Sequence, residues 1–162
     1  MQNEQSSTPT AAGDLKQDDY FQSGNVLSIL DALKSRFGDE VVKVAEDTNN
    51  RNAGAIFRNM DIPVEDRTIE KLIEVLWEPM KKIGLRYTYR KEEGGILMHC
   101  TACPLADHYI KLGSADWGYA LHCACDASIA EGFSGKIGFS RTKTLMQGHD
   151  CCDHFYFARS TT

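Results

Sequence analysis

The chain has 162 residues, of which 42% are hydrophobic and 25% are charged, and its formal net charge at pH 7 is −5. This length and composition are ordinary for a soluble one-domain protein that buries a core, and the negative charge argues against a nucleic-acid partner. No run of about 18 apolar residues is present, so no segment is expected to span a membrane.

The first 22 residues are polar and lack periodic apolar positions. They do not contain a basic stretch followed by an apolar stretch, which would mark a secretory signal. We therefore predict a disordered polar tail over residues 1–22, a single domain over residues 23–162 and a cytoplasmic location. In a reducing compartment, six cysteines indicate metal ligands, catalytic thiols or buried small side chains rather than disulfides.

Three helices are predicted in the first half of the domain. Apolar residues recur at helical spacing over residues 26–37, with Gly38 as a C-terminal cap, and more weakly over residues 40–59. The clearest helical pattern is an apolar stripe over residues 69–80.

The second half of the domain is predicted to alternate strands with helices. Apolar and polar residues alternate on both sides of the turn "KEEGG", which is typical of a hairpin. The predicted strands cover residues 85–90, 96–100 and 137–141, with a last strand that includes residues 151–154 and ends with "FYF" at 155–157, and the predicted helices cover residues 104–112 and 117–133. Helices followed by an antiparallel sheet that helices interrupt make an α+β fold.

Cysteine and histidine gather in one part of the chain. All six cysteines and all five histidines lie between His99 and His154. Burial would collect cysteines but would not collect histidines and aspartates with them. This segment is therefore expected to carry the chemistry, although its Cys-x-x-Cys and Cys-x-Cys spacings form neither a zinc-ribbon nor a thioredoxin signature.

Spacing along the predicted helix places several of these groups on one face. Cys123 and Asp126 are three residues apart and His122 and Asp126 are four apart, so the three side chains should lie together, while Cys125 points elsewhere. Cys103 directly precedes another predicted helix, whose dipole and free N–H groups are expected to favour its thiolate.

Alternation along the last strand separates the two adjacent cysteines. Cys152 shares one face with His154 and Tyr156, whereas Cys151 shares the other face with two phenylalanines. We therefore predict that Cys152 is functional and that Cys151 is a packing residue.

Several motifs together resemble the L-2-amino-thiazoline-4-carboxylic acid hydrolase family. They are "CPLAD" at 103–107, Cys-x-x-Asp at 123–126, "EGF" at 131–133, "FSRTKTLMQG" at 139–148 and "CCDHFYF" at 151–157. The likeness spans about residues 60–158, and Cys103, Cys123, Asp126 and Cys152 coincide with the family's pattern. His149 departs from it, because the family tends to have an acidic residue there.

The resemblance implies a hydrolase with a small-molecule substrate. Water would open the cyclic isothiourea ring of 2-aminothiazoline-4-carboxylate to give a carbamoyl-cysteine. The ring carbon between sulfur and nitrogen is electron-poor but resonance-stabilised, so its attack needs an activated nucleophile and a proton donor for the departing nitrogen.

Two mechanisms follow, one without a cofactor and one with zinc. In the covalent mechanism, which we favour, a thiolate of low pKa among Cys103, Cys123 and Cys152 adds to the ring carbon, and Asp126 or His154 moves protons. In the metal mechanism the three thiolates bind Zn²⁺, an open coordination position activates water, and Asp126 is the base.

Other hypotheses concern the same segment. Arg141, inside the resembling motif, is predicted to hold the substrate carboxylate by a bidentate contact. The C-terminal pattern is also similar to 4-vinyl reductase domains, which gives an alternative function as a zinc-holding module that binds a small ligand without turnover. A third hypothesis is thiol redox chemistry by Cys100 with Cys103, or by Cys151 with Cys152. Self-association into a homo-oligomer stays open.

Overall fold

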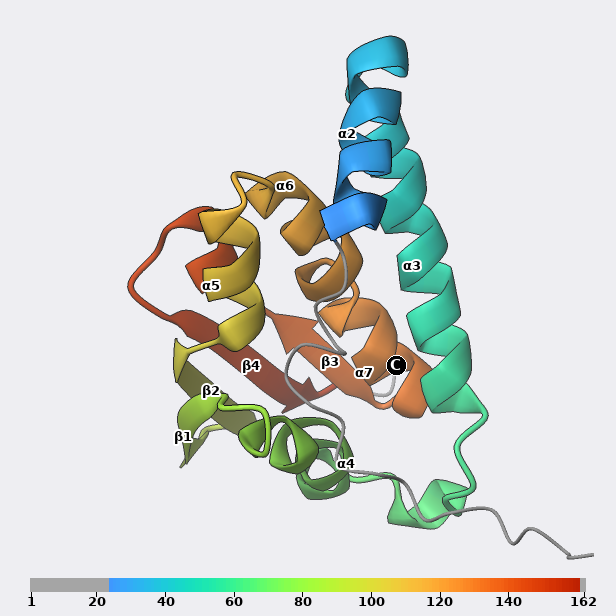
Figure 1. Ribbon diagram of the computed structural model, residues 1–162. Coiled ribbons are helices and arrows are strands. Elements are labelled where there is room, and N and C mark those ends of the chain that lie inside the picture. Colours follow the sequence, from blue (N-terminus) through green and yellow to red (C-terminus); the bar gives the residue numbers. More distant parts are fainter. Residues whose placement is uncertain (1–23, 161–162) are drawn as a thin grey trace, which may run out of the picture.

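A helical hairpin forms the N-terminal part of the fold. The computed structural model describes residues 24–160, so the predicted tail over residues 1–22 lies outside the described residues. Helices α2 (Gly24–Phe37) and α3 (Glu40–Arg58) lie side by side and extend away from the sheet (Figure 1). Gly38 joins them with a φ of +82°, a conformation that glycine adopts without strain, so its predicted role at the end of the first helix is confirmed.

Helix α4 (Ile69–Lys81) supplies one wall of the core, as its apolar stripe predicted. It follows a short 3-10 turn, η1 (Val64–Asp66), and its first turn is capped by the Thr68 side chain, which accepts a hydrogen bond from the backbone N–H of Lys71 at 3.1 Å. The residues that α4 buries are Leu72, Ile73 and Trp77.

Four antiparallel strands form one sheet in the order β1-β2-β4-β3. The strands are β1 (Arg86–Glu92), β2 (Gly95–Ala102), β3 (Ile137–Ser140) and β4 (Cys152–Ala158). With the helices that precede and interrupt it, this sheet confirms the α+β class. The two C-terminal strands lie where the alternation placed them, and β4 pairs with β2 rather than with β1.

The prediction of one continuous helix over residues 117–133 is wrong. The segment is divided into α6 (Ala115–Gly118), a π-helical turn at Tyr119–Cys123, and α7 (Asp126–Phe133). Within it the N–H of Ala124 donates to the carbonyl of Tyr119, five residues back, at 2.9 Å. Such π turns are uncommon and often occur at functional sites.

Side chains from segments that are remote in the sequence stabilise the π turn. The Asn49 side chain on α3 donates to the carbonyl of Leu121 at 2.9 Å, and Arg141 donates to the carbonyl of Cys123 at 3.1 Å. These partners satisfy carbonyls that a regular helix would pair internally. Periodicity alone could not reveal the break, because both partners are far away in the sequence.

The inner face of the sheet packs against α4 and α7. The core cluster between them includes Trp77, Met98, Phe133 and Tyr156, each at most 5% exposed. Helix α5 (Pro104–Lys111) belongs to a second cluster with Trp117 and part of the α2–α3 hairpin.

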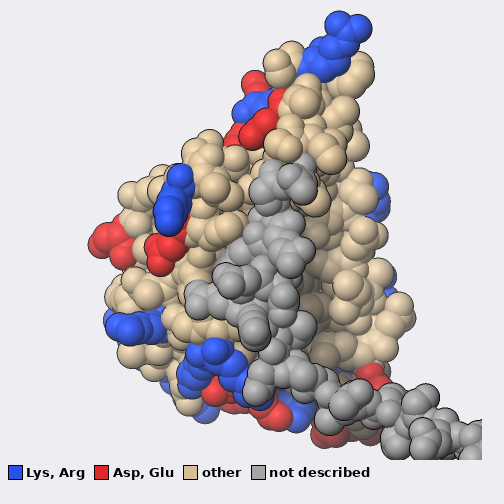
Figure 2. Space-filling view, viewed as in Figure 1, with Lys and Arg blue, Asp and Glu red and all other residues tan. Residues whose placement is uncertain are grey.

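The surface of the described residues mixes both signs of charge. On the face shown in Figure 2, basic and acidic side chains lie next to each other rather than in separate fields. Lys81 with Glu78 and Lys143 with Asp150 are examples of such exposed ion pairs. Among residues 24–160, no helix combines the length and apolar character needed to cross a membrane.

Candidate functional site

One pocket collects the predicted site residues. It has a volume of about 130 Å³ and lies between the inner face of the sheet, α4, and the segment from α5 to α7. Its lining includes all six: Cys103, Cys123, Asp126, Arg141, Cys152 and His154. The structure therefore brings them together from five separate segments, and their chemical roles stay predictions.

A buried ion pair lies at the polar end of this pocket. Arg141 Nη1 lies 2.5 Å from Asp126 Oδ2, and the two side chains are only 8% and 13% exposed. Burial acts to lower the pKa of Arg141, but Asp126, Cys123 and Tyr119 together outweigh it and the pKa is raised. The other terminal nitrogen, Nη2, donates to the Cys123 carbonyl and contacts the Tyr119 hydroxyl at 3.4 Å. A substrate carboxylate would therefore have to share or replace one of these partners.

His154 joins the ion pair through one ring nitrogen. Its Nε2 lies 3.2 Å from Asp126 Oδ2, while its Nδ1 is buried and has no hydrogen-bond partner among the described residues. Because a carboxylate only accepts hydrogen bonds, we assign the hydrogen to Nε2, which leaves a lone pair on Nδ1. The Trp77 ring lies edge-on to the imidazole at 4.8 Å between centroids and restricts its rotation.

Cys152 has the environment of a stabilised thiolate. Interaction with the Cys100 thiol lowers the pKa of Cys152, although burial acts in the opposite direction. The backbone N–H of Leu145 also lowers this pKa, since it donates to the sulfur at 3.2 Å. His154 and Arg141 add favourable charge interactions.

The loop between β3 and β4 places the Leu145 amide at that sulfur. Asp153, on the outer face of β4, accepts hydrogen bonds from the backbone N–H groups of Thr142 at 2.9 Å and Lys143 at 2.5 Å. Leu145 begins a 3-10 turn, η3 (Leu145–Gln147), which Thr144 caps. Asp153, on the outer face of the sheet, thus holds the loop whose Leu145 N–H reaches Cys152 on the inner face.

The remaining pocket thiols are held in their neutral form. Burial raises the pKa of Cys103, and this outweighs the opposing effect of the Leu105 and Ala106 amides at the start of α5. The amides at the helix N-terminus thus act in the predicted direction, but the net effect is a raised pKa for Cys103. Burial and the nearby carboxylate of Asp126 raise the pKa of Cys123 to about 12. All six cysteines lie in the described residues, and Cys152 is the one whose pKa is lowered.

Cys151 and Cys125 lie outside the pocket, as predicted. Cys151 lines a depression on the other face of the sheet with His99 and Asp153, so the separation of the adjacent cysteines is confirmed. Cys125 is buried in the core, where burial raises its pKa to about 11. His149 lies in the β3–β4 loop, and its ring contacts the Thr144 carbonyl at 3.1 Å.

Three side chains near the chemistry were not predicted as residues of the hydrolytic site. Cys100 lines the pocket, Trp77 orients His154, and Tyr119 contacts Arg141. Alternation along β2 carried a signal for Cys100, since it shares the inner face with Ile96 and Met98. Trp77 and Tyr119 carried no local signal, because their roles depend on tertiary contacts.

The thiols and carboxylate do not form a metal cage. Among residues 24–160, no group of three or more His, Cys, Asp or Glu is arranged to hold a metal ion. Asp126 is engaged by Arg141 and His154, and the Cys152 sulfur already accepts a hydrogen bond from Leu145. The zinc site stays a prediction, and we assign no step to a metal.

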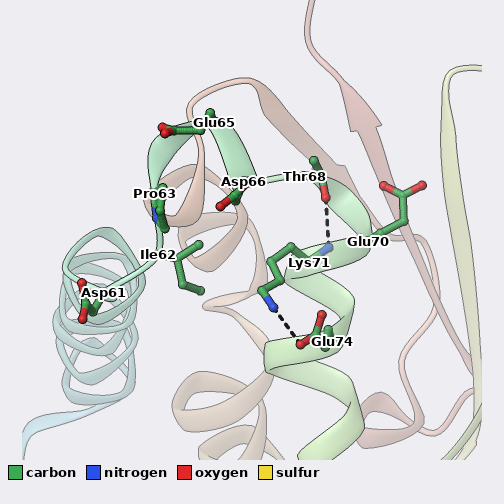
Figure 3. Close-up of a pocket in the computed structure, with 9 residues that line it drawn as sticks. All are labelled: Asp61, Ile62, Pro63, Glu65, Asp66, Thr68, Glu70, Lys71 and Glu74. Carbon is green, nitrogen blue, oxygen red and sulfur yellow. Dashed lines mark hydrogen bonds and ion pairs between the residues drawn. The ribbon is translucent and has the colours of Figure 1, made fainter.

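A wider pocket of about 640 Å³ lies at the start of α4 (Figure 3). Its ionisable lining residues are Asp61, Glu65, Asp66, Glu70, Lys71 and Glu74, and Lys71 pairs with Glu74 at 2.7 Å. The described residues that line it include no cysteine or histidine. It therefore lacks the nucleophile and the base that the smaller pocket contains.

Comparison with known proteins gives one clear match. The model of the L-2-amino-thiazoline-4-carboxylic acid hydrolase family matches residues 21–156, which include the whole pocket. Comparisons with curated proteins and with solved structures found no match.

Proposed function

Because the chain belongs to the L-2-amino-thiazoline-4-carboxylic acid hydrolase family, we propose that it hydrolyses a small cyclic isothiourea such as L-2-amino-thiazoline-4-carboxylate to a carbamoyl-cysteine. The observation that supports this most is the Cys152 thiol, whose pKa is lowered, in one pocket with the Asp126–His154 pair. A thiolate and a base in one pocket are the components that covalent hydrolysis needs.

The buried ion pair suits a substrate with two opposite charges. The ring of the proposed substrate has a basic amidine-like group, and its substituent is a carboxylate. In the proposed complex the amidinium faces Asp126 and the carboxylate faces Arg141, the one lysine or arginine among the described residues that line the pocket. Exchanging one internal pair for two pairs with the substrate leaves no buried charge uncompensated.

The chemistry proceeds in two proposed steps. In the first, the Cys152 thiol passes its proton to Nδ1 of His154, the sulfur forms a bond to the ring carbon, the carbon–nitrogen bond breaks, and the nitrogen takes that proton from Nδ1. In the second, water adds to the same carbon and gives a proton to Nδ1 of His154, and the bond to Cys152 breaks. Asp126 stabilises the imidazolium whenever His154 holds the extra proton, before it protonates the nitrogen and again after it takes a proton from water, which is the usual role of a carboxylate beside a catalytic histidine.

The test mixes the reduced protein with L-2-amino-thiazoline-4-carboxylate and detects the ring-opened product by mass spectrometry. We expect a carbamoyl-cysteine and a loss of about 10³-fold or more in kcat for Cys152→Ser. Cys151→Ser is the matched control, because the adjacent thiol faces the other side of the sheet, and it should keep its turnover.

The structure of the product shows which ring bond is cleaved. Cleavage of the carbon–nitrogen bond releases an amine and no new thiol, whereas cleavage of the carbon–sulfur bond releases a thiol that a thiol reagent detects. Full turnover by Cys152→Ser would overturn the proposed nucleophile. The absence of ring opening by folded protein with free thiols would overturn the proposed substrate.

A further inference from the structure

Cys100 and Cys152 face each other across two neighbouring strands. They are direct partners in the antiparallel register of β2 and β4, and both side chains lie on the inner face of the sheet. Directly opposed residues in such ladders have Cα atoms about 4.5–5.5 Å apart, which lies within the range of disulfides. The thiols also influence each other: the presence of Cys100 lowers the pKa of Cys152 and Cys152 raises that of Cys100.

Position in the sheet distinguishes Cys100 from the other thiols near Cys152. Cys103 lies beyond the end of β2, Cys123 is in the π turn, and Cys151 is adjacent in sequence but belongs to the other face. Both Cys100 and Cys152 line the pocket, so a reagent as small as the substrate reaches them. The mechanism described above assigns Cys100 no bond-forming step.

We propose that Cys100 and Cys152 are a peroxide-sensitive pair that closes into a reversible disulfide and switches the pocket off. The Cys152 sulfur attacks one oxygen of a hydroperoxide, the O–O bond breaks, and the peroxide is reduced to water or an alcohol while the sulfur becomes a sulfenic acid. The Cys100 sulfur then attacks this sulfur and loses its proton, and the sulfenic oxygen leaves as water. The effect on turnover rests on the proposed function, but formation of the disulfide does not.

The fold favours the second step over further oxidation. The register already holds the two residues opposite each other, so the bond can form without a new strand pairing. The Leu145 N–H that donates to the Cys152 sulfur favours its thiolate, the form that attacks peroxide. A disulfide would then remove the nucleophile and protect it from irreversible oxidation to a sulfinic acid.

The experiment treats the reduced full chain with hydrogen peroxide, blocks the remaining thiols, and maps disulfides by mass spectrometry. Trypsin leaves Cys100 and Cys103 in one peptide, residues 92–111, and Cys151 and Cys152 in another, residues 144–159. Mapping is therefore repeated in Cys103→Ser and in Cys151→Ser. We expect the two peptides to stay linked in both variants, with four alkylated cysteines in the wild-type protein and full reversal by dithiothreitol.

The Cys100→Ser variant tests whether Cys100 is the thiol that closes the disulfide with Cys152. In this variant we expect no linked peptides, a sulfenic acid at Cys152 that dimedone traps, and faster conversion to a sulfinic acid that dithiothreitol does not reverse. A link that disappears in Cys103→Ser or in Cys151→Ser, or oxidation of the wild-type protein without any disulfide, would overturn the proposal. Ring opening is measured separately on the same samples, so an inactive reduced protein that still forms the disulfide would refute the proposed function alone.

Discussion

At the scale of single residues, the neighbours Cys151 and Cys152 differ because a strand directs successive side chains to opposite faces. Cys152 accepts a hydrogen bond from a backbone N–H and faces the Asp126–Arg141 pair across the pocket. Within the described residues, the one hydrogen-bond partner of the Cys151 thiol is the carboxylate of Asp150. Burial and the charge of this carboxylate both raise the pKa of Cys151.

The first prediction concerns pH and Cys152. Because its pKa is lowered, the thiolate should persist as the pH falls below the ordinary thiol pKa of about 8.5, and it should be lost only when the pH passes through the lower value. Iodoacetamide labelling, quantified for each cysteine by mass spectrometry, measures this. Cys125, whose pKa is raised to about 11, is the internal control and should label only at high pH. A half-maximal labelling rate for Cys152 at a pH above that of an ordinary thiol would contradict the assignment.

The second prediction concerns the buried ion pair. Asp126→Asn leaves the Arg141 charge buried without a carboxylate, so we expect a loss of about 3 kcal/mol in the free energy of unfolding. Glu74→Gln is the matched control, because it removes an exposed partner of Lys71 and should cost less than about 1 kcal/mol. Urea unfolding of the wild-type protein and both variants measures these values. Equal losses in the two variants would show that the buried pair has no special contribution.

At the scale of elements, α7 is placed by a close approach of two helices. Gly132 on α7 lies against Gly54 on α3, and a Cβ atom at Gly132 would be 2.1 Å from the Gly54 carbonyl oxygen. This contact holds α7, which begins at Asp126, close against α3. The π turn before α7 then directs Cys123 and His122 into the same pocket.

The third prediction tests this helix contact. Gly132→Ala forces the α3 and α7 backbones apart, so we expect a loss of about 2 kcal/mol in the free energy of unfolding. Gly135→Ala is the control, because no atom lies within 4 Å of its Cβ position and its φ is not positive; it should change stability by less than about 0.5 kcal/mol. Thermal unfolding of both variants gives the comparison, and a neutral Gly132→Ala would contradict the close approach.

At the scale of the whole molecule, two core clusters meet at the pocket. One lies between the sheet, α4 and α7, and the other joins α5, α6 and the N-terminal hairpin. Cys103 and Leu145 pack against both clusters. Since these residues also border the site, the two halves are expected to unfold together as a single domain.

The fourth prediction uses the two tryptophans as separate probes. Trp77 lies in the first cluster and Trp117 in the second, and the chain contains no other tryptophan. In Trp77→Phe and in Trp117→Phe, the remaining tryptophan should report the same urea midpoint as far-UV circular dichroism of that variant. Fluorescence and circular dichroism midpoints that differ within either variant would show that the clusters unfold independently.

The amino-acid sequence alone was enough to predict the family, the α+β class, most of the helices and strands, and the group of residues that share the pocket. Alternation along β4 assigned its two faces, so the strand pattern itself separated Cys152 and His154 from Cys151. Motif spacing likewise placed Cys123 beside Asp126.

The identity of the activated thiol and the break in the long helix both depend on tertiary contacts. The pKa of Cys152 depends on Cys100 in another strand and on a loop amide, and burial cancels the local advantage of Cys103. The π turn depends on Asn49 and Arg141, which are remote from it in the chain. Periodicity reports which face a residue occupies, whereas burial and hydrogen bonding depend on segments that meet only in the folded protein.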